Sequence, residues 1–432
     1  MNRLNRIFHN KQIKLFWFLR SFARYLTPKR LLQSRLDRVL AEAERRPDWE
    51  YICRRADYYN KLSPAPATPP REGLRPLGDH KFRRGVKTAY FFDTYEFTRW
   101  FSDRLLWNTV PGDVTTVPDV PSIVKSRPIC GDNANSVLLN LDKVRHFIFL
   151  RDDIPFRKKS DKAIFRLAIT RRPHRERFMR MYFGSECCDA GISTPRPEYP
   201  PEWTKPHISM YDHLNYKFIL AIEGYDVATN LKWIMSSNSL AVMPRPTYET
   251  WFMEGTLIPG YHYVEIRPDY SDLEERMRYY IEHPDEAEAI IAHAHEYVAQ
   301  FRDRRREKII SLLVLQNYFR RTGQHDVQQD AVVIVSGDLV ERRGVIGGLL
   351  DDVLLPGQRP DHDLPQGGFV FNNEYLHNTL LFLGTGGGGE NPVLKPAARH
   401  RPPKPVFQTG EITARIRKET EMPGISAARC AG

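Results

Sequence analysis

The chain has 432 residues, of which 41% are hydrophobic and 27% charged, and this composition excludes a fully disordered or fibrous protein. Its 64 Lys and Arg exceed its 53 Asp and Glu, and the resulting net charge of +11 favours a partner that carries phosphate, whether nucleic acid, anionic lipid or nucleotide sugar. The five cysteines form no CxxC pair, which argues against a disulfide framework and a zinc finger.

Residues 1–38 hold ten Lys or Arg and one acidic residue, together with aromatic side chains such as Trp17 and Phe22. The apolar run of residues 15–19 is far shorter than the ~20 residues of a spanning helix, and no signal peptide is recognisable. We expect a cytoplasmic protein, peripheral on the inner membrane, whose residues 1–38 lie on the anionic surface. The alternative is a helix that packs on its own domain and leaves its arginines in solvent.

The body of the chain alternates between strand-like and helix-like segments. A Pro-rich linker, residues 64–74, separates it from a basic helical segment, residues 1–63. The predicted strands are residues 88–92, 144–150, 163–169, 217–222, 239–243 and 261–266, and the predicted helices are residues 95–106, 230–235, 272–283 and 285–318. This alternation predicts an α/β protein with parallel sheets, in two Rossmann-like blocks of residues 75–158 and 159–324.

The C-terminal part, residues 325–432, differs from the body in composition. It holds 15 of the 26 glycines, and its apolar runs are isolated between Gly, Pro and Asp. We expect a largely disordered or loosely attached tail without a catalytic motif, and a small appended β-rich piece is the alternative.

Two strand–loop–helix units carry the chemistry that suits an anion. In the first, the strand of residues 217–222 leads into Glu223 and Gly224, and a helix is expected to begin near Thr229 or Asn230. The amide groups at such a helix start bind phosphate, although an ordinary capped helix has the same pattern. The chain contains neither GxGxxG nor GxxxxGK[ST], so a dinucleotide fold and a P-loop are not supported.

In the second unit, the strand that contains Phe165 leads into a basic turn with Arg166 and Arg175, whose guanidinium groups suit bidentate phosphate binding. A solvated basic loop is the alternative. A third feature is Asp119, which lies between Pro118 and Pro121 in a stiff loop. A fixed carboxylate of this kind suits a general base, and a turn-forming Asp is the alternative.

Several stretches resemble one known family when they are taken together and in order. They are residues 120–139, residues 143–147 and the sequence EGYDVATNLKW at residues 223–233. The chain is similar to the family 90 glycosyltransferases, most of all to the bacterial lipopolysaccharide-core enzymes, which are related to animal protein O-glucosyltransferases and to capsule-associated proteins. The resemblance implies a GT-B fold in which residues 75–158 hold the acceptor and residues 159–324 the UDP-sugar donor. It implies an inverting transfer of a hexose, glucose or galactose, to a hydroxyl of a lipopolysaccharide-core sugar such as a heptose. No cofactor, metal or nucleic acid is expected.

The resemblance also assigns roles to single residues. Asp119 matches the family's general base, in an Asp-x-Pro loop. The residues that match the donor site are Arg166, Thr170, Arg175, Asp226, Thr229, Asn230, Lys232 and Glu249. Two positions depart from the family pattern, since Leu167 replaces a Gly and Asn230 stands where animal members have an Arg nearby. There are two competing hypotheses. The first is an inactive scaffold of the same fold in a membrane glycan pathway, and the second is a basic nucleic-acid-binding protein.

Overall fold

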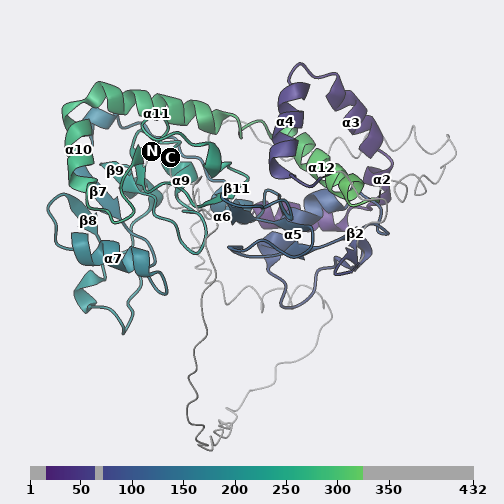
Figure 1. The fold of residues 1–432 in the computed structure, drawn as a ribbon, viewed down its shortest axis with the longest axis horizontal. Helices are drawn as coiled ribbons and strands as arrows, with labels where there is room; N and C mark the ends of the chain where they lie inside the picture. Colours follow the sequence, from purple (N-terminus) through teal and green to yellow (C-terminus); the bar gives the residue numbers. More distant parts are fainter. Residues whose placement is uncertain (1–15, 64–71, 325–432) are drawn as a thin grey trace, which may run out of the picture. The chain divides into compact units, whose positions relative to one another are not determined.

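The structure is a computed structural model that describes residues 16–63 and 72–324 (Figure 1). The predicted linker lies mostly outside these residues, and the predicted tail and the first 15 residues of the basic segment lie outside them entirely.

The described chain alternates between helices and short strands, as the sequence predicts. The helices are α2 (Arg30–Gln33), α3 (Leu36–Glu44), α4 (Trp49–Tyr59), α5 (Thr88–Thr98), α6 (Lys143–His146), α7 (Pro173–Tyr182), α8 (Met210–His213), α9 (Leu231–Ile234), α10 (Leu273–Glu282), α11 (Pro284–Ala299) and α12 (Arg304–Arg321), preceded by a helix of residues 16–26. The strands are β1 (Arg75–Pro76), β2 (Leu106–Trp107), β3 (Thr109–Val110), β4 (Ser122–Val124), β5 (Ser126–Pro128), β6 (Ser136–Leu138), β7 (Ser160–Phe165), β8 (Cys188–Ala190), β9 (Tyr216–Leu220), β10 (Leu240–Met243), β11 (Tyr248–Thr250) and β12 (Val264–Glu265).

The larger sheet has five parallel strands in the order β12-β10-β9-β7-β8. Along β9, Phe218 and Leu220 pack toward one core, with side chains of α7, α10 and α11, while Ile219 packs toward the other core, with side chains of α9. This alternation buries both faces of the sheet, which is typical of parallel sheets covered by helices. The prediction of an α/β protein with parallel strands is therefore confirmed.

A smaller parallel sheet has the order β3-β4-β6, with Ile123 of β4 paired to Thr109 on one side and to Val137 on the other. An antiparallel pair of β5 and β11 connects it to the larger sheet, because β5 follows β4 and β11 follows β10 in the chain. The carboxyl ends of the strands in both sheets are the places where a ligand is expected.

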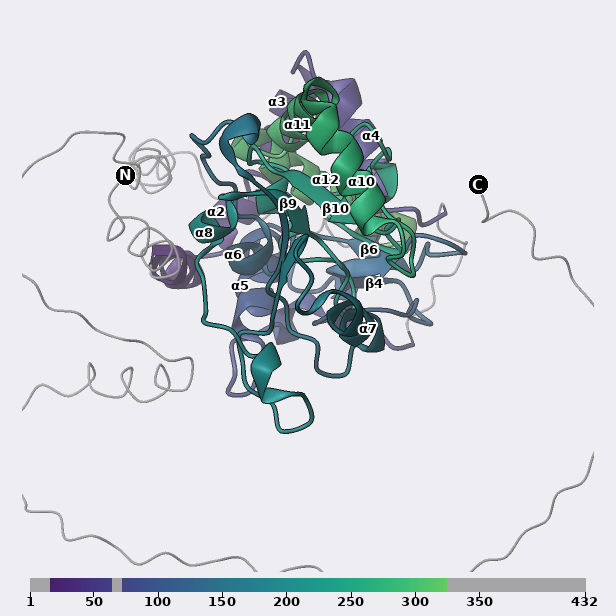
Figure 2. The ribbon, with the colours of Figure 1, turned by 90° about the vertical axis from the view of Figure 1, so that its left-hand side faces the viewer.

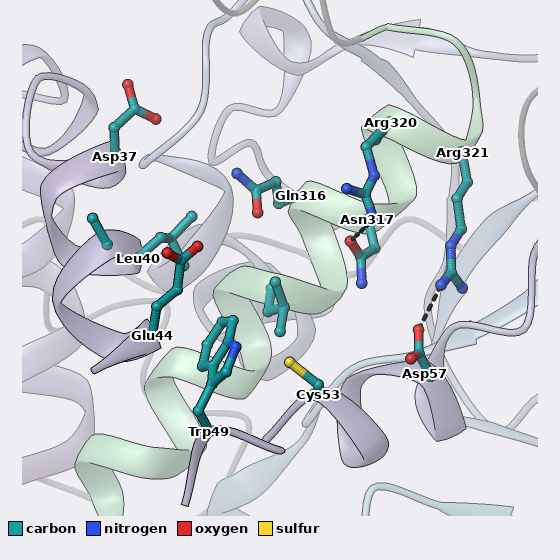
Figure 3. Close-up of a pocket in the computed structure, with 12 residues that line it drawn as sticks. Asp37, Leu40, Glu44, Trp49, Cys53, Asp57, Gln316, Asn317, Arg320 and Arg321 are labelled. Carbon is teal, nitrogen blue, oxygen red and sulfur yellow. Dashed lines mark hydrogen bonds and ion pairs between the residues drawn. The ribbon is translucent and has the colours of Figure 1, made fainter. Parts of the chain in front are cut away.

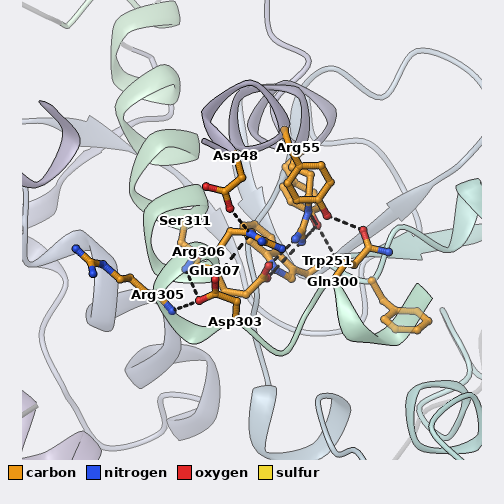
Figure 4. Close-up of polar contacts among 12 residues, drawn as sticks. Asp48, Arg55, Trp251, Gln300, Asp303, Arg305, Arg306, Glu307 and Ser311 are labelled. Carbon is orange, nitrogen blue, oxygen red and sulfur yellow. Dashed lines mark hydrogen bonds and ion pairs between the residues drawn. The ribbon is translucent and has the colours of Figure 1, made fainter. Parts of the chain in front are cut away.

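The last described helix, α12, packs against α4 through a buried polar network (Figure 4). The Nη1 atom of Arg55 lies 2.5 Å from Oε1 of Glu307, and the indole Nε1 of Trp251 donates to Oε2 of the same carboxylate, also at 2.5 Å. The ring of Trp251 stacks on Tyr59 at 3.9 Å between centroids. This network joins β11, α4 and α12, three elements far apart in the sequence.

Several predicted elements match the structure and others are wrong. The segments at residues 217–222, 230–235 and 239–243 are confirmed as β9, α9 and β10, and those at residues 163–169 and 261–266 correspond in part to β7 and β12. The strand predicted at residues 88–92 is instead the first half of α5, because a short apolar run that is buried all round fits a helix as well as a strand. Residues 144–150 form the short helix α6 and irregular chain, and the helix predicted at residues 285–318 is two helices, since Asp303 caps a new start at α12.

The helix of residues 16–26 lies against α5 (Figure 2). Its aromatic side chains Trp17, Phe22 and Tyr25 contact Phe92. Part of the apolar side that the sequence assigned to a membrane is therefore packed on the chain itself. In residues 16–63 and 72–324, no helix combines the length and the apolar composition needed to cross a bilayer.

Candidate functional site

Arg175 of α7 is a buried cation at the carboxyl ends of β7 and β9. It is only 7% exposed, and its guanidinium donates to three main-chain oxygens, those of Glu223 at 2.7 Å, Ile222 at 2.6 Å and Ala168 at 2.9 Å. None of these acceptor oxygens carries a formal negative charge. Burial, together with the neighbouring Arg172, lowers the pKa of Arg175 to about 10. Three contacts leave two of the five guanidinium N–H groups for a ligand.

A second guanidinium, that of Arg172, lies beside the first. Its Nη1 donates to the main-chain oxygen of Thr170 at 2.9 Å, its plane covers the ring of Tyr225 at 4.1 Å, and its Nε is buried without a hydrogen-bond partner among the described residues. A Cβ atom on Gly224 would lie 3.4 Å from Nη2 of Arg175 and 3.6 Å from Nε of Arg172, so the two guanidinium groups line the backbone at that glycine. We call Arg172, Arg175 and Gly224 the two-arginine site.

The local chain geometry favours an anion at the two-arginine site. Arg172 is the N-cap of α7, and Pro173 occupies the first turn, so the positive end of a ten-residue helix is located there. Arg171 just before it has φ of 54°, a left-handed conformation that a non-glycine residue adopts at an energetic cost and that is frequent at functional sites. By contrast, α9, whose start the sequence proposed for the anion, has only four residues and no side-chain cap.

The carboxyl edge of the smaller sheet carries a second group of charges. Lys125, which directly follows β4 and is 2% exposed, places its Nζ 2.5 Å from Oδ1 of Asp113 and 2.6 Å from Oδ2 of Asp226. Asp113 follows β3, whereas Asp226 lies in the loop after β9. Lys125 therefore joins the carboxyl edges of the two sheets.

The pKa values of the two carboxylates in this group shift in opposite directions. Burial raises the pKa of Asp226, and the nearby Lys125 opposes that shift without cancelling it. Burial also acts on Asp113, but the Lys125 ammonium and its hydrogen bond outweigh it and lower the pKa below the ordinary value. With a side chain that is 34% exposed, Asp113 is an ionised carboxylate that is accessible to a ligand.

Beyond β6 the same edge holds polar atoms that the protein does not satisfy. His146 is 3% exposed, and neither of its ring nitrogens has a hydrogen-bond partner within the described part of the chain. Burial and the cations Lys232 and Lys125 hold its pKa well below the usual range, so the imidazole is neutral. Asp142, at the start of α6, has φ of 56° and pairs with Arg145 at 3.0 Å. Buried polar side chains without a partner are rare in native proteins, so His146 is a candidate contact for a polar ligand.

Four of the predicted donor residues form ion pairs with other side chains of the protein. Arg166 pairs with Asp189 at 2.8 Å, and Asp226 pairs with Lys125. Lys232 is fully buried with its Nζ 2.5 Å from Oε1 of Glu254, and Glu249 accepts from Nε of Arg127 at 2.8 Å and from the hydroxyl of Tyr58.

The other predicted residues keep groups that are not paired with a charge. Arg175 belongs to the two-arginine site, and the main-chain oxygen of Thr170 holds Arg172. The side-chain amide of Asn230 donates to the oxygen of Leu220 at 2.8 Å, while its Oδ1 is buried without a partner among the described residues. Thr229 is half-buried in the same loop.

Asp119 lies apart from both groups. It is exposed, and its main-chain oxygen accepts from Nδ2 of Asn135 at 3.0 Å. Asn135 precedes β6, and its own oxygen accepts from the amide of Ser122, the first residue of β4. Asp119 is thus located at the amino edge of the smaller sheet, whereas Asp113 is at the carboxyl edge.

Sequence reasoning missed Arg172, Asp113, Lys125 and His146. Arg172 was within the basic turn, but nothing in the pattern distinguishes it from Arg171. Asp113 could have been identified from its position three residues after β3. A strand of two residues, however, shows no hydrophobic periodicity from which it could be predicted.

A cavity of about 390 Å³ lies elsewhere, between α3, α4 and α12 (Figure 3). Asp37 and Glu44 line it from α3, and Arg320 lines it from α12, where Arg321 pairs with Asp57 of α4. It contains no strand end and none of the predicted site residues. Within residues 16–63 and 72–324, no three His, Cys, Asp or Glu side chains converge in a way that would hold a metal ion.

Comparison with known proteins gives a consistent result. The model of the family described as "Glycosyl transferase family 90" matches residues 141–337. The O-glucosyltransferase LpsA of Dichelobacter nodosus is 42% identical over 271 residues, which is 62% of this chain and 82% of that protein. Shorter matches are Protein O-glucosyltransferase 2 of Danio rerio, 30% identical over 19% of this chain and 17% of that protein, and Protein O-glucosyltransferase 3 of Rattus norvegicus, 29% identical over 31% and 26%.

Proposed function

Because the chain belongs to the family 90 glycosyltransferases, we propose that it transfers a hexose, glucose or galactose, from a UDP-sugar to a hydroxyl of a lipopolysaccharide-core sugar, with a heptose as the acceptor. The observation that carries the proposal is the two-arginine site, where two guanidinium groups that have no carboxylate partner among the described residues lie at the start of α7. The name of the bacterial relative, LpsA, is consistent with a lipopolysaccharide acceptor. The location of the reaction at the cytoplasmic face of the inner membrane is part of the same proposal.

The diphosphate of the donor binds at the two-arginine site. Arg175 offers two N–H groups and Arg172 its unsatisfied Nε, and both lie beside a loop whose glycine lets the ligand approach the backbone. As the bond to the sugar breaks, UDP gains negative charge, and fixed cations at that position stabilise the transition state more than the ground state. Thr170, which holds Arg172 through its main-chain oxygen, and Thr229 and Asn230 of the loop after β9 are proposed as further donor-binding residues.

The acceptor is activated by a carboxylate. In the reaction, the acceptor oxygen forms a bond to C1 of the sugar, the bond from C1 to UDP breaks and UDP keeps the electron pair, and the acceptor proton passes to the base. The configuration at C1 is inverted. Asp119 is the base that the sequence favours, but its exposed place at the amino edge is remote from the expected ligand position. We propose Asp113, because Lys125 connects it to the loop of the donor site and keeps it ionised.

The GT-B arrangement is part of the same proposal. The smaller sheet provides the acceptor side, residues 75–158, and the larger sheet the donor side, residues 159–324. The contact of Lys125 with both Asp113 and Asp226 supports it, since two sheets whose carboxyl edges meet create a reaction site between them. The charge of UDP is balanced by arginines, so no metal is required.

The experiment is a donor screen with the full chain. UDP-glucose and UDP-galactose are supplied with a core oligosaccharide, UDP release is followed by luminescence, and the product is identified by mass spectrometry. A product heavier by one hexose supports the proposal. UDP release without transfer to the oligosaccharide contradicts the acceptor, and no release with either donor favours an inactive scaffold.

A further inference from the structure

The helix of residues 16–26 exposes an apolar face on the side away from α5. Phe16, Leu19 and Leu26 are 63%, 57% and 80% exposed, and Ala23 is exposed between them. Their spacing of three and four residues puts them on one face of a helix. Arg20 is exposed on the same face. Large apolar side chains that gather on one surface mark an interaction site, whereas scattered ones need no explanation.

A second segment, far away in the sequence, has the same character. Every residue of the loop 81–87 is exposed, including Phe82 at 38% and Val86 at 37%. Lys81, Arg83 and Arg84 alternate with these apolar side chains, and their charged groups make no hydrogen bond or ion pair with the described residues. Their charges are therefore not neutralised within that part of the chain.

Phe22 connects the two segments. Its ring centroid lies 6.0 Å from that of Phe82, in an edge-to-face contact. On the helix, Phe22 is three residues after Leu19 and four before Leu26, so it borders the exposed apolar face. The helix face and the loop are thus parts of one continuous surface, which we call the basic-apolar surface (Phe16, Leu19, Arg20, Ala23, Leu26 and residues 81–87).

We propose that the basic-apolar surface docks on an anionic lipid bilayer, with the loop of residues 81–87 as an anchor equal in importance to the helix. Its cations attract anionic headgroups, and its apolar side chains enter the boundary between headgroups and acyl chains. A nucleic acid would neutralise the cations but would leave the exposed Phe16, Leu19 and Leu26 in water, so the mixture of the two residue kinds favours lipid.

The test is flotation of the full-length protein with vesicles of phosphatidylcholine, with and without phosphatidylglycerol. We expect binding only to the anionic vesicles. The triple variant Lys81→Glu, Arg83→Glu, Arg84→Glu should lower the partition coefficient at least about 100-fold, since each cation contributes about a factor of five to ten. A matched control changes Lys158, Lys162 and Arg278, three exposed cations elsewhere, to Glu and should bind like the wild type.

A second variant, Leu19→Ser with Leu26→Ser, tests the apolar part and should also weaken binding to anionic vesicles. Thermal unfolding of each variant shows whether it is folded. The proposal is overturned if the loop triple floats as well as the wild type, if the control triple loses binding equally, or if the wild type ignores the vesicles. Binding to duplex DNA in a gel shift at physiological salt, with no flotation, would assign the surface to nucleic acid instead.

Discussion

Replacement of Asp113 by Asn tests the reaction geometry most directly. The amide has the shape of the carboxylate but cannot accept the acceptor proton. General-base catalysis contributes about 10² to 10⁴-fold, so kcat should fall at least about 10²-fold, which corresponds to about 2.7 kcal/mol of transition-state stabilisation.

Little else should change in this variant. Lys125 keeps its contact with Asp226, and Asp113 is one-third exposed, so the lost ion pair costs at most about 1 kcal/mol of stability. The two-arginine site is untouched, and UDP affinity should stay within about twofold, which separates an effect on the chemical step from one on binding.

The assay is steady-state UDP release at saturating donor, with UDP affinity measured by calorimetry, for Asp113→Asn and Asp119→Asn in parallel. We expect kcat to fall at least about 10²-fold in the first variant and to stay near the wild-type value in the second. An active Asp113→Asn beside an inactive Asp119→Asn would refute the placement of the reaction at the carboxyl edge. Equal loss in both would mean that neither position alone defines the base.

Arg175→Ala should weaken UDP binding at least about tenfold by calorimetry, whereas Arg177→Ala, an exposed neighbour on the same helix, should not; equal affinities would remove Arg175 from the donor site. Lys125→Met leaves the buried Asp226 without its cationic partner and should lower the free energy of unfolding by about 3 to 5 kcal/mol, and Asp226→Asn added to it should restore most of the loss in denaturant titrations. His80 has its pKa lowered by burial from 6.5 to about 4, so the unfolded chain binds a proton that the folded one does not; stability should fall by about 3 kcal/mol as the pH drops from 6.5 to about 4, and His80→Phe should flatten that slope.

The sequence predicts strands β9 and β10 of the larger sheet well because they are continuous and apolar, whereas β7 and β12 were predicted only in part and β8 was not predicted. The runs that became β9 and β10 are buried on both faces and are bounded by polar loops, so their type and position follow from the pattern. The smaller sheet could not be predicted in the same way, since β3 has two residues and β4 and β6 have three each. Its strands depend on tertiary pairing. Because they could not be predicted, the position of Asp113 at the carboxyl edge of the sheet could not be predicted either.

The candidate site was predicted less completely than the fold, and the reason is electrostatic. A sequence shows which residues carry charge but not which charges neutralise one another. Arg166 and Arg175 look alike in the basic turn, yet the first pairs with Asp189, whereas the hydrogen bonds of the second to the described residues all go to main-chain oxygens. Lys232 follows a polar loop that suggests phosphate binding. The local sequence does not show that its ammonium pairs with the distant Glu254.

The partner of each cation therefore matters more than the net charge of +11. A buried cation with a carboxylate, such as Lys232, has its charge satisfied by folding, and a ligand would have to break that pair at a cost of several kcal/mol. Burial of Arg175 costs desolvation free energy, and the carbonyl dipoles that it contacts among the described residues offset this cost only in part. An anion that enters the site would provide the missing negative charge. By this criterion we propose Arg172 and Arg175 for the donor diphosphate, and we propose a separate, exposed partner for the loop cations Lys81, Arg83 and Arg84, whose side chains have no ion-pair partner among the described residues.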